Sequence, residues 1–184
     1  MIITVSGVAG SGKGSVCRML SERLKFNYYS IGDLRRMMAR DRGMTLEEFN
    51  KLGETHAFTD KDADDYQAAL GQKEDNFIME GRMSYHFIPH SIKIFLYVDP
   101  HVASKRIFND KSSNRFNQKK VESLEEQLKL TMDRDASDKH RYRKYYSVED
   151  FTDRKNFDLY IDTSYSTVEE VANQIIDFVK NYKK

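Results

Sequence analysis

A glycine-rich segment that directly follows a short apolar run constrains this chain more than any other feature. Residues 2–6 read Ile-Ile-Thr-Val-Ser, which is typical of a buried strand, and helical spacing begins at about Lys13. Between them, residues 7–15 read Gly-Val-Ala-Gly-Ser-Gly-Lys-Gly-Ser, so that four of the chain's nine glycines lie in residues 7–14. This spacing satisfies G-x-x-x-x-G-K, in which glycines let the backbone turn its N–H groups toward a chain of phosphates. The segment therefore predicts a strand–loop–helix unit that binds phosphate.

A merely tight turn between a strand and a helix is the alternative. Such a turn would not need a lysine at the start of the helix, where the helix dipole disfavours a cation. A bound phosphate is attracted both by the helix N-terminus and by the lysine ammonium, so phosphate binding explains Lys13 better. We therefore expect this loop to hold a nucleoside triphosphate. The residues expected to contact it are Gly7, Val8, Ala9, Gly10, Ser11, Gly12, Lys13, Gly14 and Ser15.

The residue after Lys13 departs from the common form of such a loop. Gly14 stands where a Ser or Thr usually supplies the hydroxyl that holds Mg²⁺, and Ser15 carries a hydroxyl one residue later. Glu80 ends a later apolar run, and a carboxylate there is a suitable outer-shell partner for Mg²⁺. The sequence predicts that Ser15, Glu80, water and the phosphates share the ion.

Strand and helix patterns alternate along the rest of the chain. Five runs are typical of strands: residues 2–6, 26–30, 77–79, 91–98 and 158–161. Helical spacing recurs at about residues 13–24, 32–42, 60–70, 100–109, 121–134 and 166–182, and Thr45 with Glu48 forms a capping box that opens another short helix. The polar stretch 111–118 predicts a loop. This alternation predicts a three-layer α/β fold with a five-stranded, mainly parallel sheet.

Composition narrows the class of protein. Lys and Arg number 30 against 29 Asp and Glu, and this balance gives no overall attraction to nucleic acid or to an anionic membrane. No window approaches the roughly 18 apolar residues of a membrane span, and the first residues lack the pattern of a signal peptide. The single cysteine, Cys17, falls in an apolar helical pattern that predicts a buried, inert thiol. We expect a cytoplasmic protein that acts as a monomer.

Charged residues follow two other predicted strands, at the edge of a parallel sheet where ligands bind. After the second strand, Gly32 permits a sharp turn and Asp33 can cap a helix whose first turn carries Arg35 and Arg36. Ser30, Asp33 and Arg36 are candidate contacts to the substrate. A phosphate beside Arg36 would offset the unfavourable dipole, but a solvated arginine pair is equally consistent with the sequence. After the third strand, Arg82 can bind a phosphoryl group in a bidentate manner, or it can form a local salt bridge.

The segment from residue 105 to residue 143 is rich in arginine. Its arginines are Arg106, Arg115, Arg134, Arg141 and Arg143. Arg134 and Arg141 are seven residues apart, so they share a face if the helix continues beyond residue 134. Phosphoryl transfer needs cations around its transition state, but ion pairs with nearby aspartates would also explain this pattern.

These segments, in this order, resemble the nucleoside monophosphate kinase family, and the sequence is most similar to its short, archaeal-type cytidylate kinases. The matching segments are residues 7–15, residues 29–33 with Arg36, residues 79–82, residues 134–142 and residues 160–164. The resemblance implies the P-loop NTPase fold as a single kinase domain over residues 1–184, with a monophosphate-binding flap at about 43–70 and a lid at about 110–145. It further implies ATP as the phosphoryl donor, with Mg²⁺.

The resemblance also implies roles for individual residues. Lys13, Arg82, Arg134 and Arg141 would be catalytic, with the acceptor monophosphate between Arg36 and Arg82. Arg106 would lie near the ATP base, which residues 162–165 would line. Asp110 departs from the family, because many relatives have a basic residue there.

The acceptor base is the remaining question. Cytosine offers an exocyclic amine from which a carboxylate can accept, and Asp60 and Asp64 are four residues apart on one helical face of the expected flap. An acid-rich helix start explains the same residues. We expect phosphoryl transfer from ATP to CMP or dCMP. A kinase for AMP, UMP or a non-nucleotide acceptor is the first alternative, and a nucleotide-binding regulatory module without phosphotransfer is the second.

Overall fold

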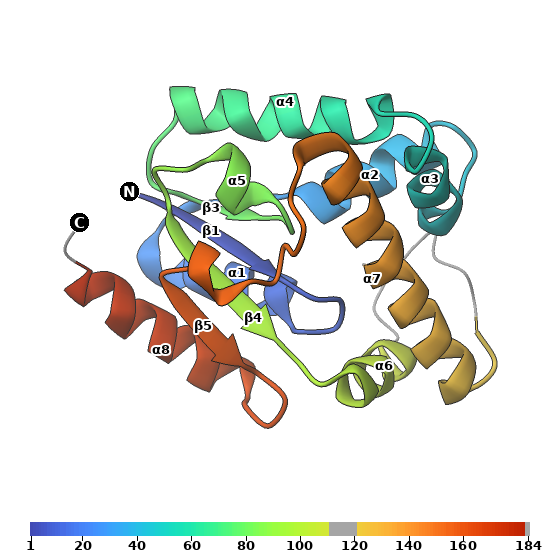
Figure 1. Cartoon of the computed structure of the whole chain (residues 1–184). Helices are drawn as coiled ribbons and strands as arrows, with labels where there is room; N and C mark the ends of the chain where they lie inside the picture. The colour runs from blue at the N-terminus through green and yellow to red at the C-terminus, as the bar shows by residue number, and fades with distance from the viewer. Residues whose placement is uncertain (111–120, 183–184) are drawn as a thin grey trace.

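A five-stranded sheet forms the centre of the protein in the computed structural model, which describes residues 1–110 and 121–182 (Figure 1). Its strands are β1 (Ile2–Gly7), β2 (Asn27–Ser30), β3 (Phe77–Glu80), β4 (Ile92–Tyr97) and β5 (Leu159–Asp162). They follow the order β2-β3-β1-β4-β5, and every neighbouring pair is parallel. All five predicted strands are confirmed, so their carboxyl ends lie along one edge of the sheet. The predicted loop at 111–118, with Arg115, falls outside the described residues.

The helices account for most of the remaining described residues. They are α1 (Lys13–Leu24), α2 (Ile31–Arg40), α3 (Leu46–Gly53), α4 (Phe58–Lys73), α5 (Ser84–Phe87), α6 (Pro100–Asn109), α7 (Leu124–Tyr146) and α8 (Val168–Asn181), with a 3₁₀ turn η2 (Arg154–Asn156). The sequence did not predict α5 or η2, because segments this short show no helical period. It also ended α7 too early, since the helix continues for twelve residues beyond Arg134, to Tyr146.

Helices cover both faces of the sheet, as the predicted three-layer fold requires. Side chains alternate along each strand, so Ile3 and Val5 of β1 pack with α1 and α8 on one face. On the other face, Phe77 and Met79 of β3 pack with α2, α4 and Ile88. Strands buried on both faces read as apolar runs, which is why the sequence revealed them.

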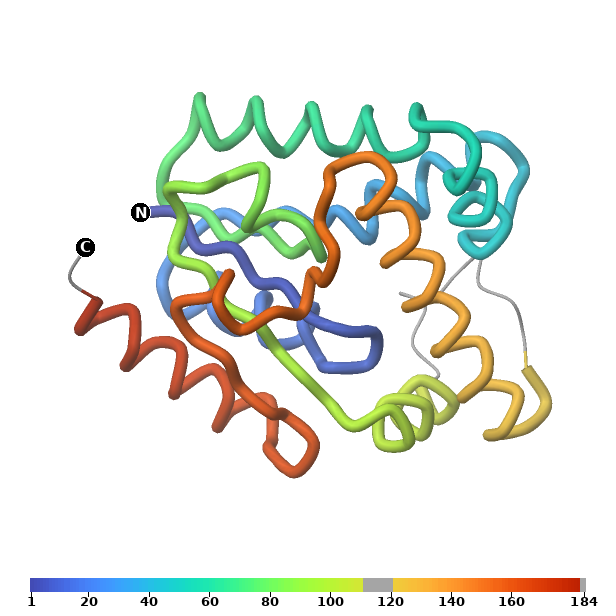
Figure 2. Tube along the Cα trace, viewed as in Figure 1, coloured from blue at the N-terminus to red at the C-terminus, as the bar shows by residue number. Residues whose placement is uncertain are grey.

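The elements that extend past the carboxyl edge of the sheet are α3, α6 and α7. The Cα trace in Figure 2 shows α7 running from α6 toward α4, and it contacts both α6 and α3. Ser123 begins α7 by accepting a hydrogen bond from Glu126 N at 3.1 Å, and the capping box predicted at Thr45 and Glu48 begins α3. These helices therefore form the far wall of the space beyond the strand ends.

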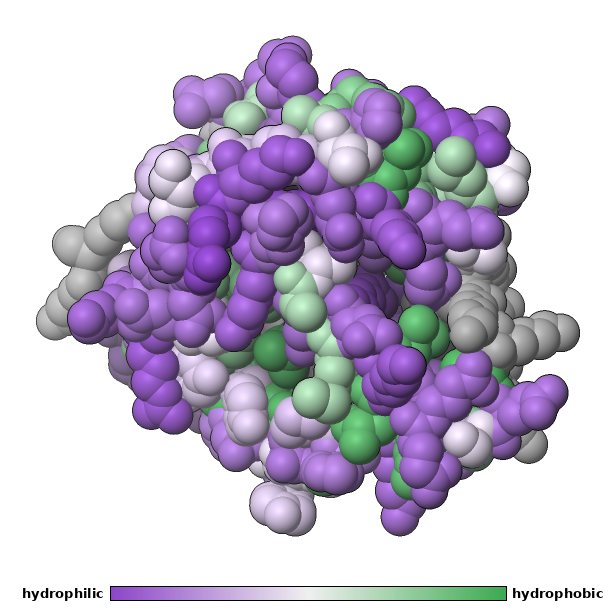
Figure 3. Space-filling view, turned by 45° about the vertical axis from the view of Figure 1, so that its right-hand side comes forward, coloured by the Kyte–Doolittle hydropathy of each residue, from purple (hydrophilic) through white to green (hydrophobic). Residues whose placement is uncertain are grey.

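None of the described helices is long and apolar enough to cross a membrane. The face seen in Figure 3 is mainly hydrophilic, with hydrophobic residues interspersed, and it is hollowed near its centre. Cys17 is completely buried in α1, as its apolar surroundings predicted.

Candidate active site

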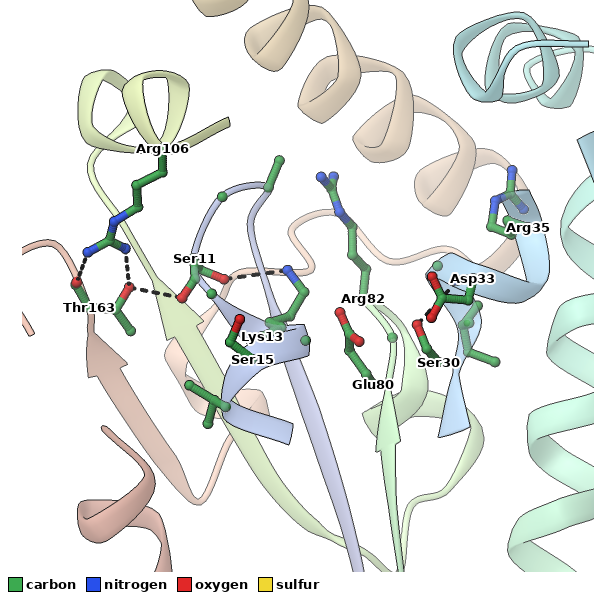
Figure 4. A pocket seen from close by; sticks show the side chains of 18 of the residues that line it. Ser11, Lys13, Ser15, Ser30, Asp33, Arg35, Glu80, Arg82, Arg106 and Thr163 are labelled. Carbon is green, nitrogen blue, oxygen red and sulfur yellow. Dashed lines mark hydrogen bonds between the residues drawn. The ribbon is translucent and has the colours of Figure 1, made fainter. Parts of the chain in front are cut away.

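A cavity of about 670 Å³ lies beyond the carboxyl ends of the strands. Residues 9–15 line its middle, Arg106 and Thr163 line one end, and α2 and α3 line the other (Figure 4). Volumes of this size are typical of ligand sites. The sheet edge where the sequence placed the chemistry is therefore a continuous hollow with the glycine-rich loop at its centre.

The backbone of the loop requires its glycines. Gly10 and Gly12 have φ angles of 75° and 83°, in the left-handed region that favours glycine. A Cβ on Gly10 would also lie 2.9 Å from the Cα of Ala103, so the loop packs directly against α6. Ser11 Oγ donates to Val8 O at 3.0 Å across the turn. The loop is thus held in its curved shape by local geometry and by its contact with α6.

Lys13 places a buried cation in the middle of the cavity. Its Nζ donates to Gly7 O at 3.0 Å and to Val8 O at 2.7 Å. Burial lowers the pKa of Lys13 to about 8, because the charged form has lost most of its hydration. The ammonium stands at the N-terminus of α1, so lysine and helix end present positive charge together.

Arg106 lies at the end of the cavity formed by the connection between β5 and α8. It donates to Thr163 O at 2.7 Å and to Ser164 O at 3.2 Å. Thr163 Oγ1 in turn donates to Ser11 O at 3.1 Å, which joins this connection to the loop. The structure therefore brings Arg106 beside residues 162–165, the segment that the sequence associated with the donor base. Asp110 lines the same end.

Glu80 and Ser15 both line the cavity next to the loop. The Glu80 carboxylate accepts a hydrogen bond from the Tyr28 hydroxyl, and one of its oxygens is 3.5 Å from where a Cβ on Gly14 would stand. One carboxylate and one hydroxyl suit Mg²⁺, which prefers oxygen ligands and keeps several waters. Within residues 1–110 and 121–182 no group of three His, Cys, Asp or Glu side chains could hold a metal ion. An ion here would thus depend on phosphate and water for most of its ligands.

Arg35 and Arg36 of α2 both line the cavity but bind different carboxylates. Arg36 lines the cavity and donates to Asp33 Oδ1 at 2.6 Å, and Ser30 Oγ accepts from the backbone N of Asp33 at 3.2 Å. Arg35 instead donates to Asp60 Oδ1 at 2.8 Å. Both side chains are largely buried, so the alternative of a solvated arginine pair is wrong.

A buried carboxylate joins two of the other predicted arginines. Asp138 of α7 is 3% exposed and forms ion pairs with both Arg82 and Arg141. Burial alone would raise the pKa of Asp138, but the two guanidinium charges outweigh it and hold the pKa below its ordinary value. Arg82 also pairs with Asp135 at 2.8 Å. The alternative of ion pairs with nearby aspartates is therefore correct for Arg141, whereas Arg82 pairs with distant aspartates of α7 and not in a local salt bridge. Both side chains still line the cavity.

Arg134 differs from its neighbours because no described carboxylate lies within ion-pair distance of it. It lines the same cavity, and burial lowers its pKa to about 10. The nitrogens Arg36 Nε, Arg82 Nη2 and Arg134 Nε are all buried without a hydrogen-bond partner among the described residues. Buried donors in native proteins are almost always bonded, so three unbonded donors around one cavity suit an anionic ligand with many oxygens.

The two aspartates expected to contact the acceptor base do not line this cavity. Asp60 is buried between Arg35 and Arg141, the latter at 3.3 Å. Asp64 accepts from the Tyr146 hydroxyl and from Gln67 Nε2 at 3.0 Å. Their positions differ from the expected ones because α4 packs against α3. The acidic side chains of α4 bind arginine and tyrosine side chains there and do not face the cavity.

Arg18 and Asn50 are two polar residues of the cavity that sequence reasoning missed. Arg18 follows Lys13 by five residues on the first turns of α1, a spacing that carries no distinctive signal. Asn50 did carry one, because it lies four residues after Leu46 on the apolar face of α3. A side-chain amide on an otherwise apolar helix face needs a polar partner and can mark a site.

Known proteins match this chain over nearly its whole length. A sequence model of the cytidylate kinase-like family matches residues 2–165. The chain is 36% identical to a cytidylate kinase of Methanocella arvoryzae over 184 residues, covering 100% of this chain and 99% of that protein. It is 33% identical to a cytidylate kinase of Methanocaldococcus jannaschii, with 100% of both chains covered. A shikimate kinase structure from Aquifex aeolicus has a TM-score of 0.58 at 20% identity, covering 98% of this chain and 96% of that one, and so shares the P-loop kinase fold.

Proposed function

The chain belongs to the cytidylate kinase-like family and is a nucleoside monophosphate kinase, and we propose that it transfers the γ-phosphoryl group of ATP to CMP or dCMP. The observation that carries this proposal is the continuous cavity, in which the glycine-rich loop separates two ends that could each hold a nucleotide. A binding module for one nucleotide would not need the second end or its arginines. We assign all of residues 1–184 to one kinase domain, with residues 43–70 as the acceptor flap and 110–145 as the lid.

The acceptor phosphate supplies the attacking oxygen. A phosphate monoester is largely a dianion near neutral pH, so no general base is needed. The oxygen forms a bond to the γ-phosphorus of ATP while the bond from that phosphorus to the β-phosphate oxygen breaks, which leaves ADP and a diphosphate product. Catalysis then consists of in-line positioning and charge stabilisation.

The cations of the cavity would divide this work. Lys13 and the N–H groups of the loop would hold the β- and γ-phosphates, and Arg36 with Arg82 would hold the acceptor phosphate. Arg134 and Arg141 would face the transferring group from α7. Of the four arginines, Arg134 is the one without an ion-pair partner among the described residues, so its full charge is available to the transition state.

Ser15 and, through water, Glu80 would hold Mg²⁺, which when bound neutralises charge on the β- and γ-phosphate oxygens. The hydroxyl of Tyr28 already orients the Glu80 carboxylate. At the other end, Arg106 and residues 162–165 would surround the donor base. The hydrogen bonds from Arg106 to Thr163 and Ser164 support this assignment, because they hold these segments together.

A panel of acceptors at fixed ATP and Mg²⁺ tests the acceptor. CMP, dCMP, UMP, AMP and shikimate would be compared by coupled detection of ADP. We expect CMP and dCMP to have the highest kcat/KM. Rapid turnover of AMP or shikimate with no use of CMP would contradict the proposed acceptor but not the kinase class. ATP binding without acceptor-dependent ADP release would indicate a regulatory module instead.

Lys13→Ala tests the role of the loop in the same assay. We expect kcat to fall by about a thousand-fold, since a charge that acts on the transferring group is removed. Stability should change little, because Lys13 Nζ bonds only to the loop itself. Lys51→Ala is the matched control, as Lys51 is exposed on α3 away from the cavity. Turnover of Lys13→Ala near the wild-type rate would refute the assignment.

A further inference from the structure

Asn50 is a polar side chain in an apolar position at the acceptor end of the cavity. It lies on the buried face of α3 with Leu46 and Phe49, and it is 6% exposed. Leu46, Ile31 and Asn50 all line the cavity beyond Arg36. This end thus offers two aliphatic side chains, which suit the faces of a planar base, and one amide.

The orientation of this amide is determined by Arg35. Arg35 Nη2 donates to Asn50 Oδ1 at 3.0 Å, and a guanidinium has only donors, so the oxygen of the amide must face it. Arg35 is itself held by Asp60 Oδ1 at 2.8 Å and by Thr59 O at 2.7 Å. The amide of Asn50 therefore cannot flip without losing this chain of bonds.

The nitrogen of the Asn50 amide, Nδ2, is available to donate a hydrogen bond to a ligand. Asn50 Nδ2 donates no hydrogen bond to the residues that the structure describes. It is also not one of the fully buried side-chain nitrogens and oxygens without a partner. An unbonded atom of this kind keeps some contact with solvent. Because the residue is otherwise buried and borders the cavity, that contact is with the cavity.

We propose that Asn50 determines the acceptor base, with Nδ2 donating to the Watson–Crick edge of a pyrimidine. This inference rests on the proposed function, since it assumes a nucleoside monophosphate at this end of the cavity. Cytosine has lone pairs on N3 and O2 that accept from an amide N–H, whereas uracil carries a hydrogen on N3. Enzymes commonly read a base at this edge. Asn50 would thus distinguish CMP from UMP by the proton on N3.

The same geometry gives Asp60 an indirect role. Asp60 does not line the cavity, but it fixes Arg35, and Arg35 fixes the amide of Asn50. Asp60 is therefore a positioning residue for base recognition rather than a contact to the base. This explains how an aspartate of the expected flap can matter for the acceptor while lying outside the cavity.

Asn50→Asp tests the proposal with little change in shape. One carboxylate oxygen can still accept from Arg35, while the other accepts where Nδ2 donated, so it favours the N–H of uracil. We expect the ratio of kcat/KM for CMP to that for UMP to fall by about ten-fold or more, the value of one hydrogen bond of ordinary strength. The KM for ATP should not change, and Lys51→Ala should leave the ratio at its wild-type value.

Direct binding provides a second measurement. Ribose 5-phosphate has the acceptor phosphate but no base, so calorimetry should give the same Kd for it with the wild type, Asn50→Asp and Asn50→Ala, while the Kd for CMP rises in both variants. An unchanged ratio of CMP to UMP in Asn50→Asp that still binds ribose 5-phosphate would overturn the role of Asn50. A wild type that does not use CMP would overturn the proposed acceptor instead. If Asn50→Asp fails to fold, the Kd of Asn50→Ala for CMP tests the proposal instead. A Kd equal to that of the wild type would overturn the role of Asn50.

Discussion

Single residues of this site owe their properties to burial next to particular neighbours. Lys13 and Arg134 both have lowered pKa values because they lose hydration, whereas the pKa of Arg141 is raised because nearby negative charges outweigh its burial. A cation kept in a poorly hydrated place binds an anion strongly, since little further hydration is lost. The arginines and lysine of the cavity are therefore not equivalent, although their sequence positions suggested similar roles.

The pKa of Lys13 predicts how nucleotide affinity depends on pH. With a pKa of about 8, Lys13 is charged at pH 7 and loses its proton as the pH rises above 8. A bound phosphate favours the charged form, so affinity should be constant below pH 8. Above it, affinity should fall by up to about ten-fold per pH unit. Calorimetry with a non-hydrolysable ATP analogue measures this.

The matched variant for that experiment is Lys13→Met, which has no titrating group in the loop. Its affinity should be weaker throughout and should not vary across the same range of pH. A wild-type affinity that stays constant far above pH 8 would show that Lys13 does not contribute its charge to binding.

At the scale of elements, α7 carries on one face both residues that pair in buried ion pairs and the proposed catalytic residue Arg134. Arg134, Asp138 and Arg141 lie on consecutive turns of this helix and all line the cavity. Arg141 also joins α7 to α3 and α4, since it donates to Asn50 O at 3.3 Å and pairs with Asp60. The helix thus supports the acceptor end while it presents Arg134 to the centre.

Substituting Arg134 and Arg141 of α7 should separate these roles. Arg134→Met should lower kcat by about 10²- to 10³-fold without loss of stability, because it removes an unpaired buried charge. Arg141→Met should lower the free energy of unfolding by about 3–5 kcal/mol, because it leaves the Asp138 and Asp60 carboxylates buried without this partner. Denaturant unfolding and the coupled assay measure both effects.

Arg143→Met is the control on the same helix. Arg143 pairs with Glu149 at 2.8 Å, but both side chains are well exposed, so little change is expected in either measurement. Equal loss of stability in Arg134→Met and Arg141→Met would contradict the difference that we infer between them.

At the scale of the whole molecule, one cavity connects elements from the first strand to the last helix. Its lining extends from Ala9 in the loop to Val171 in α8. Because both proposed nucleotide sites belong to this cavity, their phosphates can meet beside Lys13. The fold thereby brings donor and acceptor together by binding alone.

A linked analogue tests this continuity. Adenosine and cytidine joined through a phosphate chain long enough to span both ends should bind about 10²- to 10⁴-fold more tightly than ATP or CMP. It should also raise Tm more than either at equal concentration, because tighter binding to the native state adds stability. An analogue with a chain too short to span the cavity should show neither gain. Equal affinities for the long and short analogues would mean that the two ends are not filled together.

Local patterns were sufficient to predict much of this protein. The glycine-rich loop, the five strands and the capping box at Thr45 depend on residues close together in the chain, so their signals are visible without the fold. Residues 134–141 could be predicted only in part. The spacing put Arg134 and Arg141 on one face on the condition that the helix continued, and only the structure showed that it does. The short helix α5 left no periodic signal, because four residues make only one turn.

The sequence by itself determined the fold class, the phosphate-binding loop, the kinase class and most of the charged residues around the cavity. Only the tertiary structure decided how these charges pair: Asp138 with Arg82 and Arg141, Asp60 with Arg35, and Arg134 with no described carboxylate. Only the structure showed that Asn50 lines the cavity and that Asp60 and Asp64 do not. The physical reason is that backbone conformation and burial patterns arise locally. Ion pairing and base recognition depend instead on side chains from α2, α3, α4 and α7, which meet only when the helices pack.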